Sequence, residues 1–195
     1  MIEMKVEVDN IQEVKKRLGV LCNKAPSVIA NAINRTVTNV KKNMAQETVQ
    51  RYYTTSTEVK KTIKTSRATK TNLSGAAVSK ASPIALSKFK VSPNRPIHYS
   101  RGNVSPNVYK VSVKKGEERK PLDVNPKAFI AVMGSGHKGV FRRKSSAAMP
   151  IKQLFGPSVP QMLKNAEIMG RVQEEAKNTL KKRIDAEIEN ILRRE

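Results

Sequence analysis

The chain has 195 residues and a mass of 21.7 kDa, which suits one domain of ordinary size. Its 38 Lys and Arg residues outnumber its 16 Asp and Glu residues, so the net charge is +22 and the isoelectric point is near 10.3. The single cysteine excludes an internal disulfide framework and a metal site built from several thiolates. Neither a long apolar run nor a secretory signal is present, which predicts a soluble, basic protein made in a reducing cytoplasm.

The N-terminal residues predict a strand followed by a short helix. Apolar and charged residues alternate over 4–8, as they do in a half-buried strand. We expect Asp9 to cap a helix over 11–18, because its side chain can accept hydrogen bonds from the first turn. Gly19 is expected to end this helix.

A second, longer helix is predicted after Pro26, with Ser27 near its cap, and it extends to about Tyr53. Its apolar residues recur at steps of three to five and form one stripe: Val28, Ala32, Ile33, Thr36, Val40, Met44 and Val49. A short helix over 55–63 is expected to follow.

The middle of the chain predicts strands and loops. Residues rich in Thr, Ser, Ala and Lys begin at Lys64 and are followed by a long polar loop at about 83–107. Residues 108–116 predict a strand with one apolar side, formed by Tyr109, Val111 and Val113. The continuous apolar run over 128–133 is typical of a buried strand, and residues 140–144 are expected to pair with it as a hairpin.

The C-terminal region has the strongest periodic signal, which predicts a long helix from about Gln161 to Arg193. Its stripe is formed by Met162, Ala166, Met169, Val172, Ala176, Leu180, Ile184, Ile188 and Ile191. Because this length exceeds that of a typical helix, we expect part of the helix to pack against a neighbouring chain.

This order of elements predicts an α+β fold, in which an antiparallel β-sheet packs against N-terminal helices and a long C-terminal helix, with long extended loops. We expect one domain over 1–195 with three segments. These are an N-terminal strand and helices at 1–63, a basic β-rich middle with a long loop at 64–148, and a Pro-stiffened connection with the long helix at 149–195.

The sequence offers little support for catalysis. The pattern G-x-G-x-x-G occurs at Gly134, Gly136 and Gly139. A dinucleotide site also needs a helix and a suitably spaced acid after this pattern, and neither follows. A glycine-rich hairpin turn is therefore a better interpretation than a dinucleotide site. The two histidines, His98 and His137, lie far apart, and Cys22 stands in an apolar patch that predicts a buried thiol. We therefore predict no enzyme activity, no cofactor and no metal.

Residues 51–116, the basic block, contain fourteen Lys and Arg residues and one acid, Glu58. A solvated surface and a surface that faces DNA or an acidic protein are about equally good interpretations of this block. A second basic cluster, Arg142, Arg143 and Lys144, lies within residues 140–144. Arg suits bidentate contact with phosphate or carboxylate. The residues expected to contact DNA or an acidic partner are Lys60, Lys64, Arg67, Lys70, Lys80, Lys88, Lys90, Arg101, Arg142 and Arg143.

From Ala128 to the C-terminus, the sequence resembles the minor tail protein Z family of tailed bacteriophages and prophages. The most specific sequence motifs are GVFRR at 139–143, PI at 150–151 and LFGPSVPQM at 154–162, followed by a long amphipathic helix. The early helix with AINRTVTNVKKNMAQE matches the family's N-terminal helix in style. About a third of the chain matches closely.

Prolines stiffen the connection that carries this resemblance, because proline fixes its own backbone and biases the preceding residue away from a helix. Its apolar residues are expected to form a corner between sheet and C-terminal helix, or to contact the next subunit. The motif comprises Phe141, Pro150, Leu154, Phe155, Gly156, Pro157, Val159 and Pro160.

The resemblance implies a virion structural protein, a tail completion or neck component within a ring at the head-proximal end of the tail, needed for tail assembly and head–tail joining. The implied partners are further copies in a homo-oligomeric ring, expected to be a hexamer, the tail terminator, tail tube and head–tail connector proteins, and genomic DNA held non-specifically in the channel. No membrane is implied. The protein is expected in the virion tail or neck, and in the host cytoplasm during assembly. The alternative that composition supports is a basic nucleic-acid-binding module of nucleoid or ribosomal type, for which recognition motifs are missing.

Overall fold

A computed structural model describes residues 1–8, 10–96, 108–122, 128–145, 147 and 149–194. The predictions made for Asp9, His98 and Arg101 therefore lie outside the described residues. The chain forms two compact units. Unit 1 comprises Met1–Thr48, Ser56–Ala81 and Val159–Glu195, and unit 2 comprises Val49–Thr55 and Ser82–Ser158.

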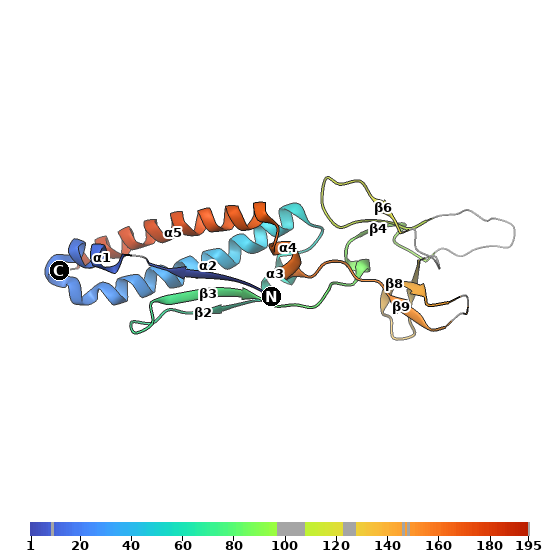
Figure 1. The fold of residues 1–195 in the computed structure, drawn as a ribbon, viewed down its shortest axis with the longest axis horizontal. Helices are drawn as coiled ribbons and strands as arrows, with labels where there is room; N and C mark the ends of the chain where they lie inside the picture. Colours follow the sequence, from blue (N-terminus) through green and yellow to red (C-terminus); the bar gives the residue numbers. More distant parts are fainter. Residues whose placement is uncertain (9, 97–107, 123–127, 146, 148, 195) are drawn as a thin grey trace. The chain divides into compact units, whose positions relative to one another are not determined.

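Unit 1 is a layer of helices on a three-stranded antiparallel sheet of order β1-β3-β2 (Figure 1). Its strands are β1 (Ile2–Glu7), β2 (Ile63–Ser66) and β3 (Ser74–Ser79). Its helices are α1 (Ile11–Leu18), the 3-10 helix η1 (Gly19–Lys24), α2 (Ala25–Arg51, which continues into unit 2), α3 (Ser56–Lys61), α4 (Val159–Leu163) and α5 (Ala166–Leu192).

The core of unit 1 lies between α2 and its neighbours. The stripe predicted for this helix is buried from Val28 to Met44, while Val49 is half-buried. β3 comes unusually close to α2 at Gly75, where an added Cβ would lie 2.8 Å from the Ile33 side chain and 2.9 Å from that of Val37. Only glycine therefore allows this spacing between sheet and helix.

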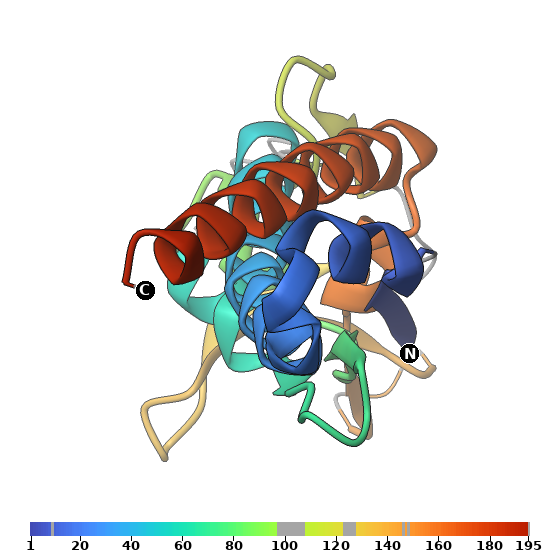
Figure 2. The same cartoon turned by 90° about the vertical axis from the view of Figure 1, so that its left-hand side faces the viewer.

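The helix α5 lies along α2 and reaches α1 (Figure 2). Ion pairs mark the contact at both ends, with Arg171 Nη1 3.4 Å from Glu47 Oε2 and Arg17 Nη1 2.7 Å from Asp185 Oδ1. Between them, Asn39 Nδ2 donates to Thr179 Oγ1 at 2.8 Å. Small and polar side chains on α2, such as Asn39, thus leave room for α5 to pack closely against it.

Three expectations for unit 1 differ in detail from the structure. The cap of α1 is Asn10, whose side chain accepts a hydrogen bond from the Glu13 N–H, while Gly19 ends the helix as predicted, with φ +55°. The second helix begins at Ala25, because η1 leads directly into it. Cys22 is exposed rather than buried, since η1 buries none of its residues.

The predicted C-terminal helix is divided into α4 and α5. Asn165 caps α5 by accepting a hydrogen bond from the Glu167 N–H, so the chain bends there. The predicted stripe is wrong at Ala166, which is exposed, and Ile168 is buried in its place. Further along, Leu180 and Ile184 are only half-buried.

Unit 2 contains two antiparallel sheets, of order β4-β5-β6 and β7-β8-β9. Their strands are β4 (Lys90–Ser92), β5 (Lys110–Ser112), β6 (Lys120–Pro121), β7 (Phe129–Val132), β8 (Lys138–Arg143) and β9 (Ile151–Gln153), and the 3-10 helix η2 spans Leu86–Lys88. The predicted hairpin of β7 and β8 is confirmed, with Phe129 opposite Phe141 and a tight turn that contains Gly136 at φ +77°. This turn is the glycine-rich hairpin expected at the G-x-G-x-x-G sequence.

The apolar run of β7 is less buried than predicted. Ile130 is buried, but Val132 is 55% exposed, because β7 is an edge strand with one face covered. Likewise, Tyr109 is buried ahead of β5 while Val111 and Val113 are half-buried. The α+β class is confirmed, with the strands in three small sheets. None of the described helices is long and apolar enough to cross a membrane.

Candidate functional site

The basic residues singled out in the sequence are distributed over both units. Lys60 is on α3, Lys64 on β2, and Arg67, Lys70 and Lys80 in or beside the loops around β3, all exposed on unit 1. Unit 2 carries Lys88 on η2, Lys90 on β4, and Arg142 and Arg143 on β8. The structure therefore groups these side chains into two sets, one on each unit.

In unit 2, several cations lie against aromatic rings. Lys90 Nζ is 5.2 Å and Lys115 Nζ is 6.0 Å from the centre of the Tyr53 ring. The Arg143 guanidinium lies 5.8 Å from the centre of the Phe129 ring. A cation over a ring face is held in position while it keeps its charge exposed, so these side chains are available to phosphate or carboxylate.

The proline-containing connection runs through unit 2 as an extended segment that the surrounding backbone holds on both sides. Leu154 donates its N–H to Val140 C=O at 2.8 Å, and its C=O accepts from the Leu86 N–H at 3.0 Å. Gly156 then donates to Ile84 C=O at 2.8 Å. These bonds fix the segment independently of its side chains.

Glycine is required at 156 because the Phe89 ring occupies the space of a side chain. A Cβ added to Gly156 would lie 2.5 Å from Phe89 Cε2 and 3.1 Å from its Cδ2. Phe89 is itself buried. The Gly-Pro pair of the motif is thus a packing requirement as well as a stiffening device.

The apolar motif residues differ in their burial. Phe141, Val159 and Pro160 are buried, Leu154 and Pro157 are half-buried, and Pro150 is exposed. Phe155 is 54% exposed, so it does not form the buried corner suggested for it. The burial of Val159 is compatible with the corner interpretation, and the exposure of Phe155 favours the alternative of a contact with another subunit, so both stay predictions.

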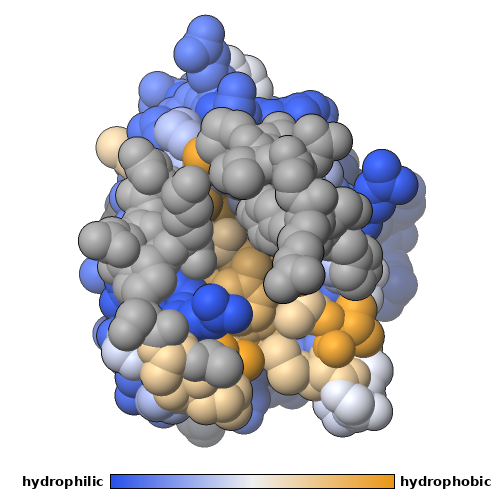
Figure 3. Space-filling model, turned by 90° about the vertical axis from the view of Figure 1, so that its right-hand side faces the viewer, coloured by the Kyte–Doolittle hydropathy of each residue, from blue (hydrophilic) through white to orange (hydrophobic). Residues whose placement is uncertain are grey.

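Unit 2 exposes two further large apolar side chains, Val132 at 55% and Met149 at 67%. A space-filling view of one face of unit 2 shows apolar surface gathered together (Figure 3). Exposed apolar surface of this kind is typical of a protein that docks on others.

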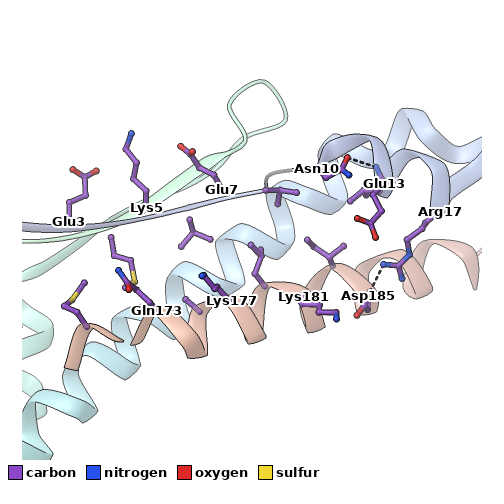
Figure 4. A pocket seen from close by; sticks show the side chains of 18 residues that line it. Glu3, Lys5, Glu7, Asn10, Glu13, Arg17, Gln173, Lys177, Lys181 and Asp185 are labelled. Carbon is purple, nitrogen blue, oxygen red and sulfur yellow. Dashed lines mark hydrogen bonds and ion pairs between the residues drawn. The ribbon is translucent and has the colours of Figure 1, made fainter. Parts of the chain in front are cut away.

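An open groove of about 1000 Å³ lies in unit 1 between β1, α1 and α5 (Figure 4). Met4 and Val6 of β1 and Val14 of α1 line it and are almost wholly buried. Leu180 and Ile184 of α5 line its other side and are half-buried. The groove thus has an apolar interior, in which the α5 side is less buried than the side formed by β1 and α1.

The rim of this groove carries balanced charge. Its acids are Glu3, Glu7, Glu13 and Asp185, and its bases are Lys5, Arg17, Lys177 and Lys181. The ion pair between Arg17 and Asp185 spans from α1 to α5. In a chain with a net charge of +22, the groove is a surface where a basic partner meets little repulsion.

Sequence reasoning missed this groove. The signals for it were the alternation over 4–8 and the excess length of the C-terminal stripe, which separately predict a half-buried strand and a partly uncovered helix. The sequence does not show that this strand and this helix lie side by side, because that depends on the tertiary packing of α1 between them. Within the described residues, no group of three or more His, Cys, Asp or Glu side chains could hold a metal ion.

Comparison with known proteins identifies one family. The family model described as prophage minor tail protein Z (GPZ) matches residues 8–195, in agreement with the resemblance found at 139–162. No curated protein and no solved structure is similar enough to count as a match.

Proposed function

Because the chain belongs to the prophage minor tail protein Z family and so has a structural role in a bacteriophage tail, we propose that it is the tail completion component at the head-proximal end. The observation that carries the proposal is the family match over 8–195, which includes both units. The alternative of a nucleoid or ribosomal module has no support from this family.

In this role, the protein forms a homo-oligomeric ring, of six copies, in the neck of the virion. A tail encloses a channel, and a head-to-tail contact between identical chains closes into a ring when the rotation between them is a simple fraction of a turn. The ring adjoins the tail terminator, tail tube and head–tail connector proteins. The protein assembles in the host cytoplasm and remains in the particle.

The net charge supports a place beside DNA or acidic protein. Exposed cations on both units, such as Lys64 and Arg143, give weak, sequence-independent affinity for phosphate, which suits passage of a genome through a channel. Membership of a family of tail structural proteins supports a protein without enzymatic activity.

Deletion of the gene from an inducible prophage tests the proposal. The expected lysate contains filled heads and separate tails by electron microscopy, and infectious titre returns when the wild-type gene is supplied in trans. Joined, infectious particles in the deletion lysate would contradict a role in head–tail joining.

A further inference from the structure

The sheet of unit 1 has two edges, β1 and β2, and no third strand of the described residues pairs beyond either. The backbone direction at these edges follows from β3. Lys80 donates its N–H to Thr62 C=O at 3.1 Å, and the Ala76 N–H donates to Ser66 Oγ at 3.0 Å. The even-numbered residues of β3 therefore face β2, and by alternation the odd-numbered ones face β1.

This alternation shows which backbone groups are directed outward. The odd-numbered residues of β3 lie opposite Ile2, Met4 and Val6. The N–H and C=O groups of Glu3, Lys5 and Glu7 consequently point away from β3, toward the open edge. By the same reasoning, Ile63 and Thr65 present their backbone groups at the free edge of β2, because Lys64 and Ser66 face β3.

The edge of β1 opens into the groove between β1 and α5. Figure 4 shows Glu3, Lys5 and Glu7 pointing away from α5, with the groove between β1 and α5. A strand added to this edge would hydrogen-bond to β1 and cover the half-buried residues of α5, such as Leu180. An open edge above an apolar surface is a template for strand addition.

The second edge of the sheet suits the first in charge and direction. β2 and its flanks carry the exposed cations Lys60, Lys64, Arg67 and Lys70, whereas β1 exposes two acids, Glu3 and Glu7, and one base, Lys5. Because β1 and β2 are both antiparallel to β3, they are parallel to each other. The edge of β2 in a second copy therefore reaches β1 with the same chain direction, and it brings cations to a strand on which exposed acids outnumber bases by two to one.

We propose that β2 of a second copy of this chain adds to the free edge of β1, within the groove that α5 borders, and so joins sheets head to tail around a ring. The contact uses a different patch on each copy, which is the kind of interface that closes into a ring. This inference rests on the proposed ring and identifies its contact surface.

Proline substitutions at the two edges test the proposal. Lys5→Pro and Thr65→Pro each remove one outward N–H and leave the bonds to β3 in place, so each monomer keeps its fold. Association is measured by sedimentation at 1 M NaCl, where a Debye length of about 3 Å suppresses the repulsion between basic chains. The wild-type chain is expected to form oligomers, and each variant alone to stay monomeric.

Mixing the two variants gives the decisive result. Thr65→Pro retains an intact β1 edge and Lys5→Pro an intact β2 edge, so the mixture forms dimers that neither variant forms alone and that grow no further. Lys5→Ala, which keeps the N–H, associates like the wild type. Dimers of Thr65→Pro alone would overturn the proposal in favour of β1–β1 pairing, and wild-type-like association of both proline variants would overturn strand addition.

A charge exchange provides an independent measurement if a proline variant loses its circular dichroism spectrum. It is carried out at about 0.1 M NaCl, where a Debye length of about 10 Å still lets charges on neighbouring strands interact. Glu3→Lys with Glu7→Lys weakens association, and Lys64→Glu added to this pair restores part of it. No recovery, or a wild-type chain that stays monomeric at 1 M NaCl, would overturn the edge contact. The gene deletion described above tests the place in the tail separately, because its outcome does not depend on which surface joins the copies.

Discussion

At the scale of single residues, close approaches determine which positions tolerate change. Gly156 and Gly134 are both glycines of unit 2 without a positive φ, but their surroundings differ. The Phe89 ring fills the space beside Gly156, whereas nothing lies within 4 Å of a Cβ placed on Gly134. The pair therefore separates the effect of crowding from the effect of backbone entropy.

We predict that Gly156→Ala lowers the free energy of unfolding by about 1–3 kcal/mol, because the added methyl group forces the buried Phe89 ring from its position. Gly134→Ala is the matched control and should be neutral or slightly stabilising. Urea denaturation monitored by circular dichroism measures both. Equal midpoints for the two variants would contradict the packing described at Gly156.

A second prediction at this scale concerns the exposed pair of Lys114 and Glu117, whose Nζ and Oε1 are 2.9 Å apart. The hydrogen bond from Lys114 lowers the pKa of Glu117 below its ordinary value of 4.5, and the bond to Glu117 raises the pKa of Lys114. The stabilisation from Glu117 is present above its unfolded pKa and is lost as the pH falls through its folded pKa. That from Lys114 is lost as the pH rises through its own raised pKa.

Replacement Lys114→Met should therefore raise the pKa of Glu117 toward its ordinary value, as measured by carboxyl chemical shifts in an NMR titration. Lys115→Met is the control, because the Lys115 side chain is next in the chain but lies over the Tyr53 ring. An unchanged Glu117 titration in Lys114→Met would show that the pair does not persist in solution.

At the scale of elements, the proline-containing connection passes from solvent-exposed side chains to buried ones. Val159, at the start of α4, is 1% exposed, while Phe155 is 54% exposed only four residues earlier. The backbone bonds of Leu154 and Gly156 hold the segment in place, so the Phe155 side chain is not needed to shape it. Its exposure supports contact with another molecule.

We predict that Val159→Ala lowers the free energy of unfolding by about 2 kcal/mol, through lost methyl burial and the cavity left behind. Phe155→Ala should change it by less than about 1 kcal/mol, yet reduce infectious titre in the deletion strain. Thermal unfolding and plaque counts distinguish the two effects. Strong destabilisation of Phe155→Ala would show that Phe155 has a packing role within the monomer. A full titre would show that Phe155 makes no contact that assembly needs.

At the scale of the whole molecule, charge is the dominant feature. Fourteen bases face one acid in the basic block, and the structure distributes them over two units. On unit 2, Lys90 of β4 and Arg143 of β8 are held beside aromatic rings. Each exposed charge interacts weakly with a partner because solvent and salt screen it, so the charges of unit 2 are expected to act as a set.

Reversal of Lys88, Lys90, Arg142 and Arg143 to Glu together should leave a folded monomer but block production of infectious particles, with filled heads and separate tails visible by electron microscopy. Lys88→Glu alone is the control and should change the titre little. All four positions lie on unit 2, so this test is independent of the β1 and β2 edges. Normal joined virions from the fourfold variant would show that these charges form a solvated surface only.

The sequence by itself determined the elements whose cause is local. The periodicity of α2 and α5, the stop at Gly19, the glycine turn between β7 and β8, and the family resemblance at 139–162 were all predictable, because neighbouring residues decide them. The excess length of the C-terminal stripe also indicated an uncovered surface.

Tertiary structure alone decided which parts of these elements are covered. Cys22 and Val132 belong to apolar sequences and yet are exposed, because η1 buries none of its side chains and only one face of the edge strand β7 is covered by the described residues. Gly156 meets Phe89 across 67 positions of the chain, and β1 meets α5 to form the groove. Burial is a property of what packs against a residue, and the packing partners here are separated by long stretches of chain, so no local pattern contains them.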